Sequence, residues 1–349
     1  MPKPLSAVDA IGPAFEWTKR QLFVPFRFGR WTRLAVVCLM TGDFATGGGT
    51  PWGGSHFQLP RSRRWDSPFD LISPDWAALH SFLPLIVACV LLLILLILVW
   101  IYVASVYRFV LFDSVLYNRC ELKGAWRRWE PYGRSYFGWC LALFFGVWAG
   151  LIVLLGVPAF LAWQAGWFEQ PREHLLPLIG TGVLVLLLVV VLLLGSGVAG
   201  LFAKDFCVPM MALENVRVTE AWRRLLPMLQ REAMSYAGFI LMKIVLAMGS
   251  AIIFGIAMLL VLVAVAIPLI VVGVVLFLVA KAAGLGWNPA TFSVVVLLGG
   301  TVLTGLFYLL ALVSTPAMVF FEAYALNYFG GRYAPLGAIM SAPPAPQQG

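Results

Sequence analysis

Charged residues are scarce in this sequence. They make up 11% of its 349 residues, whereas hydrophobic residues make up 61%. A soluble domain carries about 25% charged residues, so an ordinary soluble protein is excluded. Several apolar runs exceed the ~20 residues that a helix needs to cross the ~30 Å core of a bilayer. Because a chain in lipid must satisfy its backbone hydrogen bonds within each helix, the sequence predicts an all-α, polytopic helical membrane protein.

Histidine and cysteine are also rare. The three histidines lie in or beside predicted outer loops, and none has a serine, a cysteine or paired carboxylates at a catalytic spacing. The five cysteines are scattered and form no CxxC pair, which argues against a disulfide framework and a zinc site. The sequence contains no HExxH, GxSxG or phosphate-binding loop. We therefore expect no enzyme, no metal site and no cofactor.

One segment of the chain occurs twice. The copies at 111–139 and 201–238 each follow an apolar run and contain an acid, the tetrapeptide AWRR, a proline and the dipeptide Ser-Tyr. Another long apolar run follows each copy. We interpret the copies as turn-arounds at a membrane surface and place these turn-arounds at 108–136 and 204–236. A third, divergent copy covers 15–33.

The apolar runs predict about six crossings. They cover residues 31–48, 82–107, 137–163, 175–203, 236–284 and 291–319. The run 236–284 is too long for one crossing, and Pro268, which lacks an amide donor, predicts a break or kink there. The sequence leaves open whether 31–48 and 265–284 cross fully. The predicted fold consists of repeated units, each an interfacial amphipathic helix followed by a transmembrane pair.

The basic residues indicate how the chain is oriented. Residues 1–33 carry six Lys or Arg against two acids, 108–136 carry six against three, and 204–236 carry five against four. The loops between them have no such excess. Because cytoplasmic loops are enriched in Lys and Arg, we place these segments and both termini in the cytoplasm. The chain then has a cytoplasmic amphipathic N-terminal segment (1–33), a helical membrane domain (34–340) and a disordered tail (341–349).

The tetrapeptide AWRR predicts an amphipathic helix in the membrane interface. Apolar residues recur at i, i+3, i+4 and i+7, with tryptophan on one face and paired arginines on the other. The simpler interpretation is a topological anchor that only sets the orientation. The alternative is recognition of a lipid phosphate, because arginine binds phosphate in a bidentate manner. The residues concerned are Trp126, Arg127, Arg128, Trp222, Arg223 and Arg224.

Charged residues beside or within the apolar runs are the other candidates. Asp113, Asp205 and Glu322 lie at inner ends of runs, where we expect ion pairs that hold the turn-arounds rather than a proton- or ion-coupled role. Lys243 lies ~10 Å inside a run, measured along a helix. Its stem can reach the interface, but Lys243 is also the best candidate for a residue on a substrate pathway.

The segments LFVPFRFGRWTRL and RFVLFDSVLYNR, together with AWRR, resemble those of uncharacterised bacterial multi-pass proteins. Those proteins are similar to the membrane domain attached to some glycerophosphoryl diester phosphodiesterases. The catalytic barrel of these enzymes, with its paired histidines and metal-binding acids, is absent here, so the resemblance implies no hydrolase activity. It implies a location in the bacterial cytoplasmic membrane and a lipid-associated, non-catalytic role.

Two functions remain open at this point. The first is a non-catalytic, lipid-interacting scaffold or assembly module. Its partners are membrane lipids, anionic ones included, and not nucleic acid, because the net charge of +8 is concentrated beside the apolar runs. The alternative is a transporter or permease for a small or amphiphilic solute, which would need polar groups near the membrane midplane and broken helices. The sequence does not decide the protein partners or whether the chain forms a homo-oligomer.

Overall fold

The computed structural model describes residues 5–24, 27–42, 76–117, 122–167, 174–282, 284 and 289–341, and these contain helices and no strand. In chain order the elements are α1 (Ile11–Leu22), α2 (Phe28–Thr41), α3 (Trp76–Tyr117), α4 (Leu122–Gln164), α5 (Leu175–Phe202), the π-helix η3 (Ala203–Cys207), α6 (Val208–Glu214), α7 (Val218–Arg231), α8 (Ala233–Ala282), α9 (Pro289–Gly330) and α10 (Ala334–Ser341). The prediction of an all-α, polytopic helical protein is confirmed.

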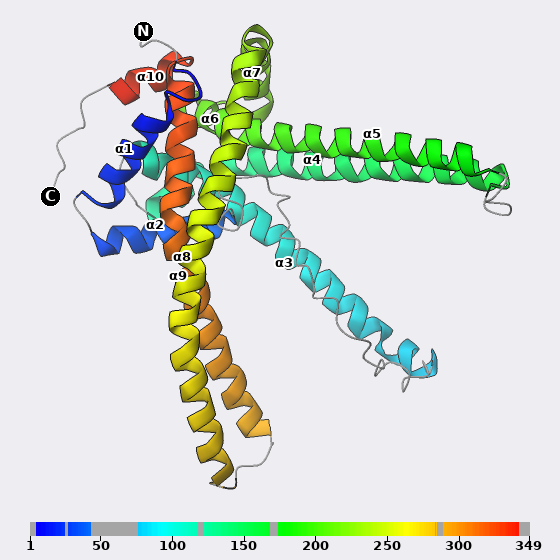
Figure 1. The fold of residues 1–349 in the computed structure, drawn as a ribbon, viewed down its shortest axis with the longest axis vertical. Coiled ribbons are helices and arrows are strands. Elements are labelled where there is room, and N and C mark those ends of the chain that lie inside the picture. Colours follow the sequence, from blue (N-terminus) through cyan, green and yellow to red (C-terminus); the bar gives the residue numbers. More distant parts are fainter. Residues whose placement is uncertain are drawn as a thin grey trace.

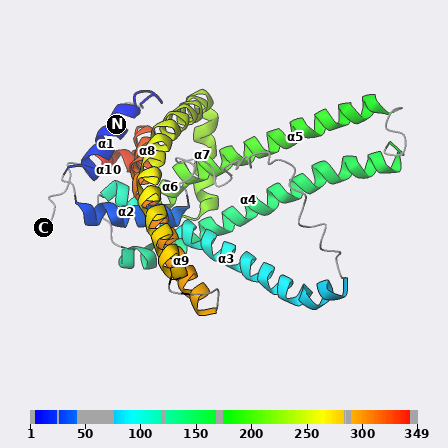
Figure 2. The same cartoon turned by 60° about the horizontal axis from the view of Figure 1, so that its bottom comes forward.

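The long helices form three arms that leave one central hub (Figure 1). One arm is α3, the second is the α4–α5 hairpin, and the third is the α8–α9 hairpin. The arms point in different directions in both views (Figures 1 and 2). The hub consists of α1, α2, η3, α6, α7 and α10 together with the inner ends of the long helices. The first and last helices of the chain therefore both lie at the hub.

The arms have the length and composition of membrane-spanning helices. Among the described residues, five segments qualify: Leu83–Tyr117, Gly124–Gln164, Leu175–Glu214, Ala233–Val279 and Thr291–Gly330. In the most apolar 18-residue stretch of each segment, at most 6% of the residues are buried inside the protein. Exposed apolar surface on this scale is unfavourable in water and needs a lipid environment. The described part of the chain is thus that of a multi-pass helical membrane protein.

The first predicted crossing, 31–48, differs from the structure. Its helical part belongs to α2, whose 14 residues extend over only ~21 Å, and residues 43–48 lie outside the described part of the chain. α2 packs in the hub against α3 and α9. The indole N–H of Trp31 donates a hydrogen bond of 3.2 Å to the carbonyl of Leu312 in α9. α2 therefore does not form a candidate span of its own.

Of the break or kink predicted at Pro268, the break is not present. α8 is one helix of 50 residues that continues through this proline, so residues 265–282 extend the same crossing rather than beginning another. Its length of ~75 Å is more than twice the bilayer core. The first turns of α8 lie in the hub, where Tyr236 and Phe239 are fully buried.

The two AWRR segments lie at the hub but belong to different kinds of element. In the second copy, α7 is a separate amphipathic helix that ends before α8 begins. In the first copy, AWRR forms the first turns of α4, which runs on through Pro131 to Gln164. The prediction of a separate interfacial helix is therefore wrong for the first copy. The two copies differ after the proline. In the first copy, three residues separate Pro131 from Ser-Tyr, and the helix continues through them. In the second copy, seven residues separate Pro227 from Ser-Tyr, and α7 ends among them, at Arg231.

Close approach and aromatic packing hold the hub together. Gly133 of α4 lies against α3, where an added Cβ would be 2.9 Å from the Cα of Val106. Phe206 of η3 is fully buried at the centre of the hub. Its ring centroid lies 5.0–6.3 Å from those of Phe202, Tyr236, Phe239, Tyr328 and Phe329. These rings come from α5, α8 and α9, so they join two hairpins at their inner ends.

Candidate functional site: a buried cluster of four charges

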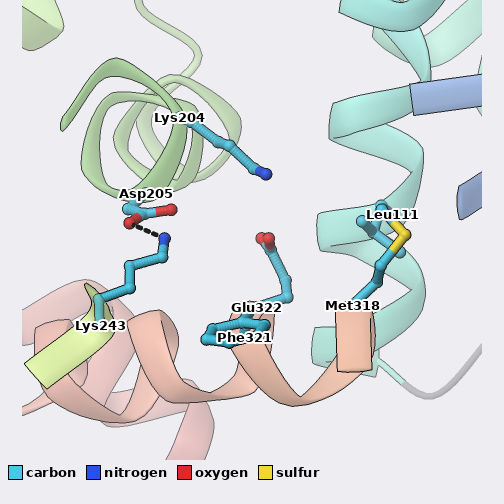
Figure 3. A pocket seen from close by; sticks show the side chains of 7 residues that line it. All are labelled: Leu111, Lys204, Asp205, Lys243, Met318, Phe321 and Glu322. Atoms are coloured by element: carbon cyan, nitrogen blue, oxygen red, sulfur yellow. Dashed lines mark hydrogen bonds and ion pairs between the residues drawn. The ribbon is translucent and has the colours of Figure 1, made fainter. Parts of the chain in front are cut away.

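Four charged side chains meet inside the hub (Figure 3). Lys204 and Asp205 come from η3, Lys243 comes from α8, and Glu322 comes from α9. All are buried, with exposures of 8%, 2%, 4% and 8%, respectively. The remaining side chains that line the site are Leu111, Met318 and Phe321. Leu111 belongs to α3, so α3 borders this charge cluster without adding a charge to it.

An ion pair between Lys243 and Asp205 forms the centre of the charge cluster. The lysine Nζ donates a hydrogen bond to Oδ2 of Asp205. Figure 3 shows the Lys204 ammonium and the Glu322 carboxylate directed toward the same space from different helices. An isolated buried ion costs several kcal/mol even after relaxation. Two cations and two anions together are tolerated because their formal charges cancel.

A π-helical turn sets the direction of two of these side chains. All five residues of η3, Ala203–Cys207, are buried. Pro209, in the first turn of α6, lacks the N–H that a regular helix would donate to the carbonyl of Asp205, and its ring would collide with that carbonyl. The widened turn avoids this collision. π-turns are rare and often mark functional sites, so this local irregularity is a second signal beside the buried charges.

The charge cluster encloses very little free space. The side chains leave about 10 Å³ between them, which is near the lower limit for one water molecule. The site therefore suits a water molecule or a proton and not an organic solute in this conformation. Among the described residues, no group of three or more His, Cys, Asp or Glu is placed to hold a metal ion.

The structure brings together three residues that the sequence singled out separately. Asp205, Lys243 and Glu322 belong to the charge cluster. Asp205 forms an ion pair, and its partner is Lys243 of α8, outside its own turn-around. Asp113, on α3, is half-buried and does not line the site. Lys243 is buried and ends at this acid inside the hub, and the reach of its stem to the membrane interface stays a prediction.

The two pairs of arginines lie in different surroundings. Arg127 and Arg128 are exposed at the start of α4, and the Arg128 guanidinium carbon lies 4.9 Å from the ring centroid of Trp129. Arg224 of α7 pairs with both Glu214 and Glu220. Arg223 lies next to one of these acids: its Nη1 is 3.5 Å from Glu220 Oε2. Acids thus partly neutralise the second pair of arginines.

The tryptophans of the two AWRR segments contact other aromatic rings of the protein. Trp126 lies 6.2 Å from Tyr102 and 5.7 Å from Tyr107, measured between ring centroids. Trp222 lies 5.3 Å from Trp139. Both tryptophans are half-buried. They therefore pack α4 on α3 and α7 on α4, in addition to any contact with lipid.

Two buried cations did not emerge from the sequence patterns. Lys204 is a member of the charge cluster, and Arg108 of α3 donates a hydrogen bond of 2.7 Å from Nη1 to the hydroxyl of Tyr136. Lys204 could have been found, because it precedes Asp205 directly in an otherwise apolar stretch. Arg108 gave no such signal, since a basic residue at the end of an apolar run is typical of a membrane interface.

The helices and the charge cluster define a multi-pass α-helical membrane protein with a buried ionic centre. Residues 5–339 match the model of a family of unknown function, DUF7544. Because the match covers nearly the whole chain, the protein belongs to this family. Comparisons with curated proteins and with solved structures found no match. The resemblance to the membrane domain of phosphodiesterases stays a prediction.

Proposed function

We propose that this protein is a non-catalytic, lipid-interacting scaffold of the bacterial cytoplasmic membrane. The observation that supports this function is the divergence of three apolar arms from one hub (Figures 1 and 2). Each arm offers nearly all of its most apolar surface to its surroundings. A molecule of this shape can hold lipids or other membrane proteins between its arms while the hub keeps the arms connected.

In this proposal the hub lies at the cytoplasmic face and the arm tips lie at the opposite face. The test is cysteine labelling in a background without the native cysteines. Lys19→Cys on α1 and Arg231→Cys on α7 should react with a membrane-impermeant reagent only when the cytoplasmic face is accessible. Ala165→Cys and Ala282→Cys, at the ends of the hairpins, should react only from the other side. Labelling of both sets from the same side would contradict this orientation.

The first pair of arginines should contribute more to binding of anionic lipid than the second pair. Each basic residue near an anionic surface contributes about 1 kcal/mol, so replacing Arg127 and Arg128 with glutamine should weaken binding about thirtyfold. Replacing Arg223 and Arg224 should weaken it less than about fivefold, because nearby acids already offset their charge. Retention of phosphatidylglycerol and cardiolipin in native mass spectrometry measures both changes.

Salt provides the control for this comparison. Binding that depends on exposed arginines should weaken as ionic strength rises, because the attraction is screened. If the variant lacking Arg127 and Arg128 inserts correctly and retains anionic lipid like the wild type, these arginines act only as orientation signals.

A second candidate function is a transporter, and the charge cluster is the observation that favours it. Ionisable groups within membrane helices often belong to proton or ion pathways, and η3 interrupts the regular helix beside Asp205. The small free volume favours a proton or small ion over an amphiphilic solute. Proton flux into liposomes that contain the protein, abolished by Asp205→Asn, would favour the transporter. No flux in the wild type above that of empty liposomes would favour the scaffold.

A further inference from the structure

A groove lies on the flank of the hub where α8 enters its membrane arm. Residues 6–8, which precede α1, one face of α8 and Arg332 line this groove. The groove encloses about 360 Å³, within the range of small-molecule sites, which begins near ~300 Å³. The lining residues on α8 are Ser235, Gly238, Leu241, Met242 and Val245.

The long side of the groove is apolar and continuous with the surface that faces lipid. Leu241 and Val245 are 65% and 55% exposed. The same surface continues along the arm to Met248 and Ile252, which are similarly exposed. Since this part of α8 belongs to a candidate membrane span, its natural contact is a lipid acyl chain.

The charged residue that lines the groove, Arg332, is paired with an acid, Glu232, which directly precedes α8. The Arg332 side chain is 7% exposed, and its Nε donates a hydrogen bond of 2.8 Å to Oε2 of Glu232. Its Nη1 donates to the carbonyls of Leu5 and Tyr328, at 2.9 and 3.1 Å. These contacts hold the guanidinium in place at the groove. The Glu232 side chain, in contrast, is 45% exposed and keeps carboxylate surface for a ligand.

We propose that this groove binds one phospholipid whose headgroup contains a phosphate and a primary amine, as in phosphatidylethanolamine. An acyl chain lies along α8, the phosphate lies next to Arg332, and the amine donates to Glu232. A zwitterionic headgroup matches this pair of opposite charges. An anionic headgroup without an amine would place the same phosphate next to Arg332 but would offer Glu232 no cation. This inference rests on the proposed lipid-binding function and names a lipid class at a site distinct from Arg127 and Arg128.

Filling the groove tests whether it holds lipid. An added Cβ at Gly238 meets no atom within 4 Å, so Gly238→Phe can place its ring in the groove without disturbing the hub. The matched control is Gly273→Phe, at a site on α8 that is equally open but lies far along the arm and outside the groove. Delipidated protein titrated with phosphatidylethanolamine in native mass spectrometry should bind at least about tenfold more weakly in the first variant only. Equal binding in both variants would overturn the proposal.

A further variant, Glu232→Gln, tests the headgroup. Glu232→Gln keeps an oxygen that accepts the hydrogen bond from Arg332, but removes the charge that faces the amine. The preference for phosphatidylethanolamine over phosphatidylglycerol and phosphatidylcholine should fall about tenfold, as expected for loss of a hydrogen bond between charged groups. An unchanged preference would overturn the assignment of the headgroup.

The two lipid proposals fail in different ways. If Gly238→Phe binds phosphatidylethanolamine normally while loss of Arg127 and Arg128 releases anionic lipid, the groove proposal is wrong and the scaffold proposal stands. If neither change alters lipid binding, both are wrong.

Discussion

Replacing Lys243 with methionine is expected to destabilise the protein by about 3–5 kcal/mol, the usual effect of removing one partner from a buried ion pair. Methionine is apolar and of similar length, so the change removes the charge and keeps most of the packing. In the variant, Lys204 alone remains to balance Asp205 and Glu322. Denaturant unfolding in detergent micelles measures the loss. Lys19→Met, on the exposed side of α1, is the control and should change stability by less than about 0.5 kcal/mol.

Adding Asp205→Asn to the Lys243→Met variant should restore most of the lost stability. The remaining charges of the cluster, Lys204 and Glu322, then cancel. A double-mutant cycle measures this coupling, because interacting residues deviate from additivity by 0.5–3 kcal/mol, whereas independent sites add within about 0.5 kcal/mol. If the losses of the two single variants simply add, the ion pair seen between these side chains does not contribute to stability.

The second large effect is expected at Phe206. Its replacement by alanine should destabilise the hub by about 3–5 kcal/mol, because a fully buried phenylalanine leaves a cavity when truncated. Phe206 contacts rings from α5, α8 and α9, so the cavity would loosen two hairpins at once. Thermal unfolding followed by size-exclusion chromatography measures this change.

Phe277→Ala is the matched control for this prediction. Phe277 lies on the α8 arm and is 62% exposed, so its truncation leaves no cavity inside the protein. The change should have less than about 1 kcal/mol effect. Equal destabilisation by both substitutions would show that the arms, and not the hub, determine stability.

The charge cluster gives the hub a role in both candidate functions. It joins η3, at the end of the α4–α5 hairpin, to both helices of the α8–α9 hairpin, and Leu111 of α3 borders it. In a scaffold, such a centre fixes the relative directions of the arms. In a transporter, a change in its protonation would alter the contact between the hairpins. The liposome experiment with Asp205→Asn decides between these roles.

The local sequence predicted the long helices and some of the residues in the charge cluster. Long apolar runs predicted the helices of the arms, because residues of this kind gain most by contact with lipid. The depth of Lys243 in such a run marks it as a candidate from the sequence alone. The identity of its partner could not be inferred in the same way, because Asp205 is separated from it by α6, α7 and the first turns of α8.

The two copies of AWRR show the limit of a local pattern. The same four residues begin the long helix α4 in one place and lie within the separate helix α7 in the other. The difference arises from the residues that follow and from the neighbours against which each segment packs. Trp126 packs on rings of α3, whereas Trp222 packs on Trp139 of α4.

By itself, the sequence determined the helical class, the apolar arms and the positions of most buried charges along the chain. These properties depend on the side chains of one segment and on its surrounding lipid. Only the tertiary structure decided that Lys204, Asp205, Lys243 and Glu322 meet in one cluster, and that Arg332, paired with Glu232, lines a groove on α8. A buried charge must find an opposite charge, but which one it finds depends on how the inner ends of distant helices pack.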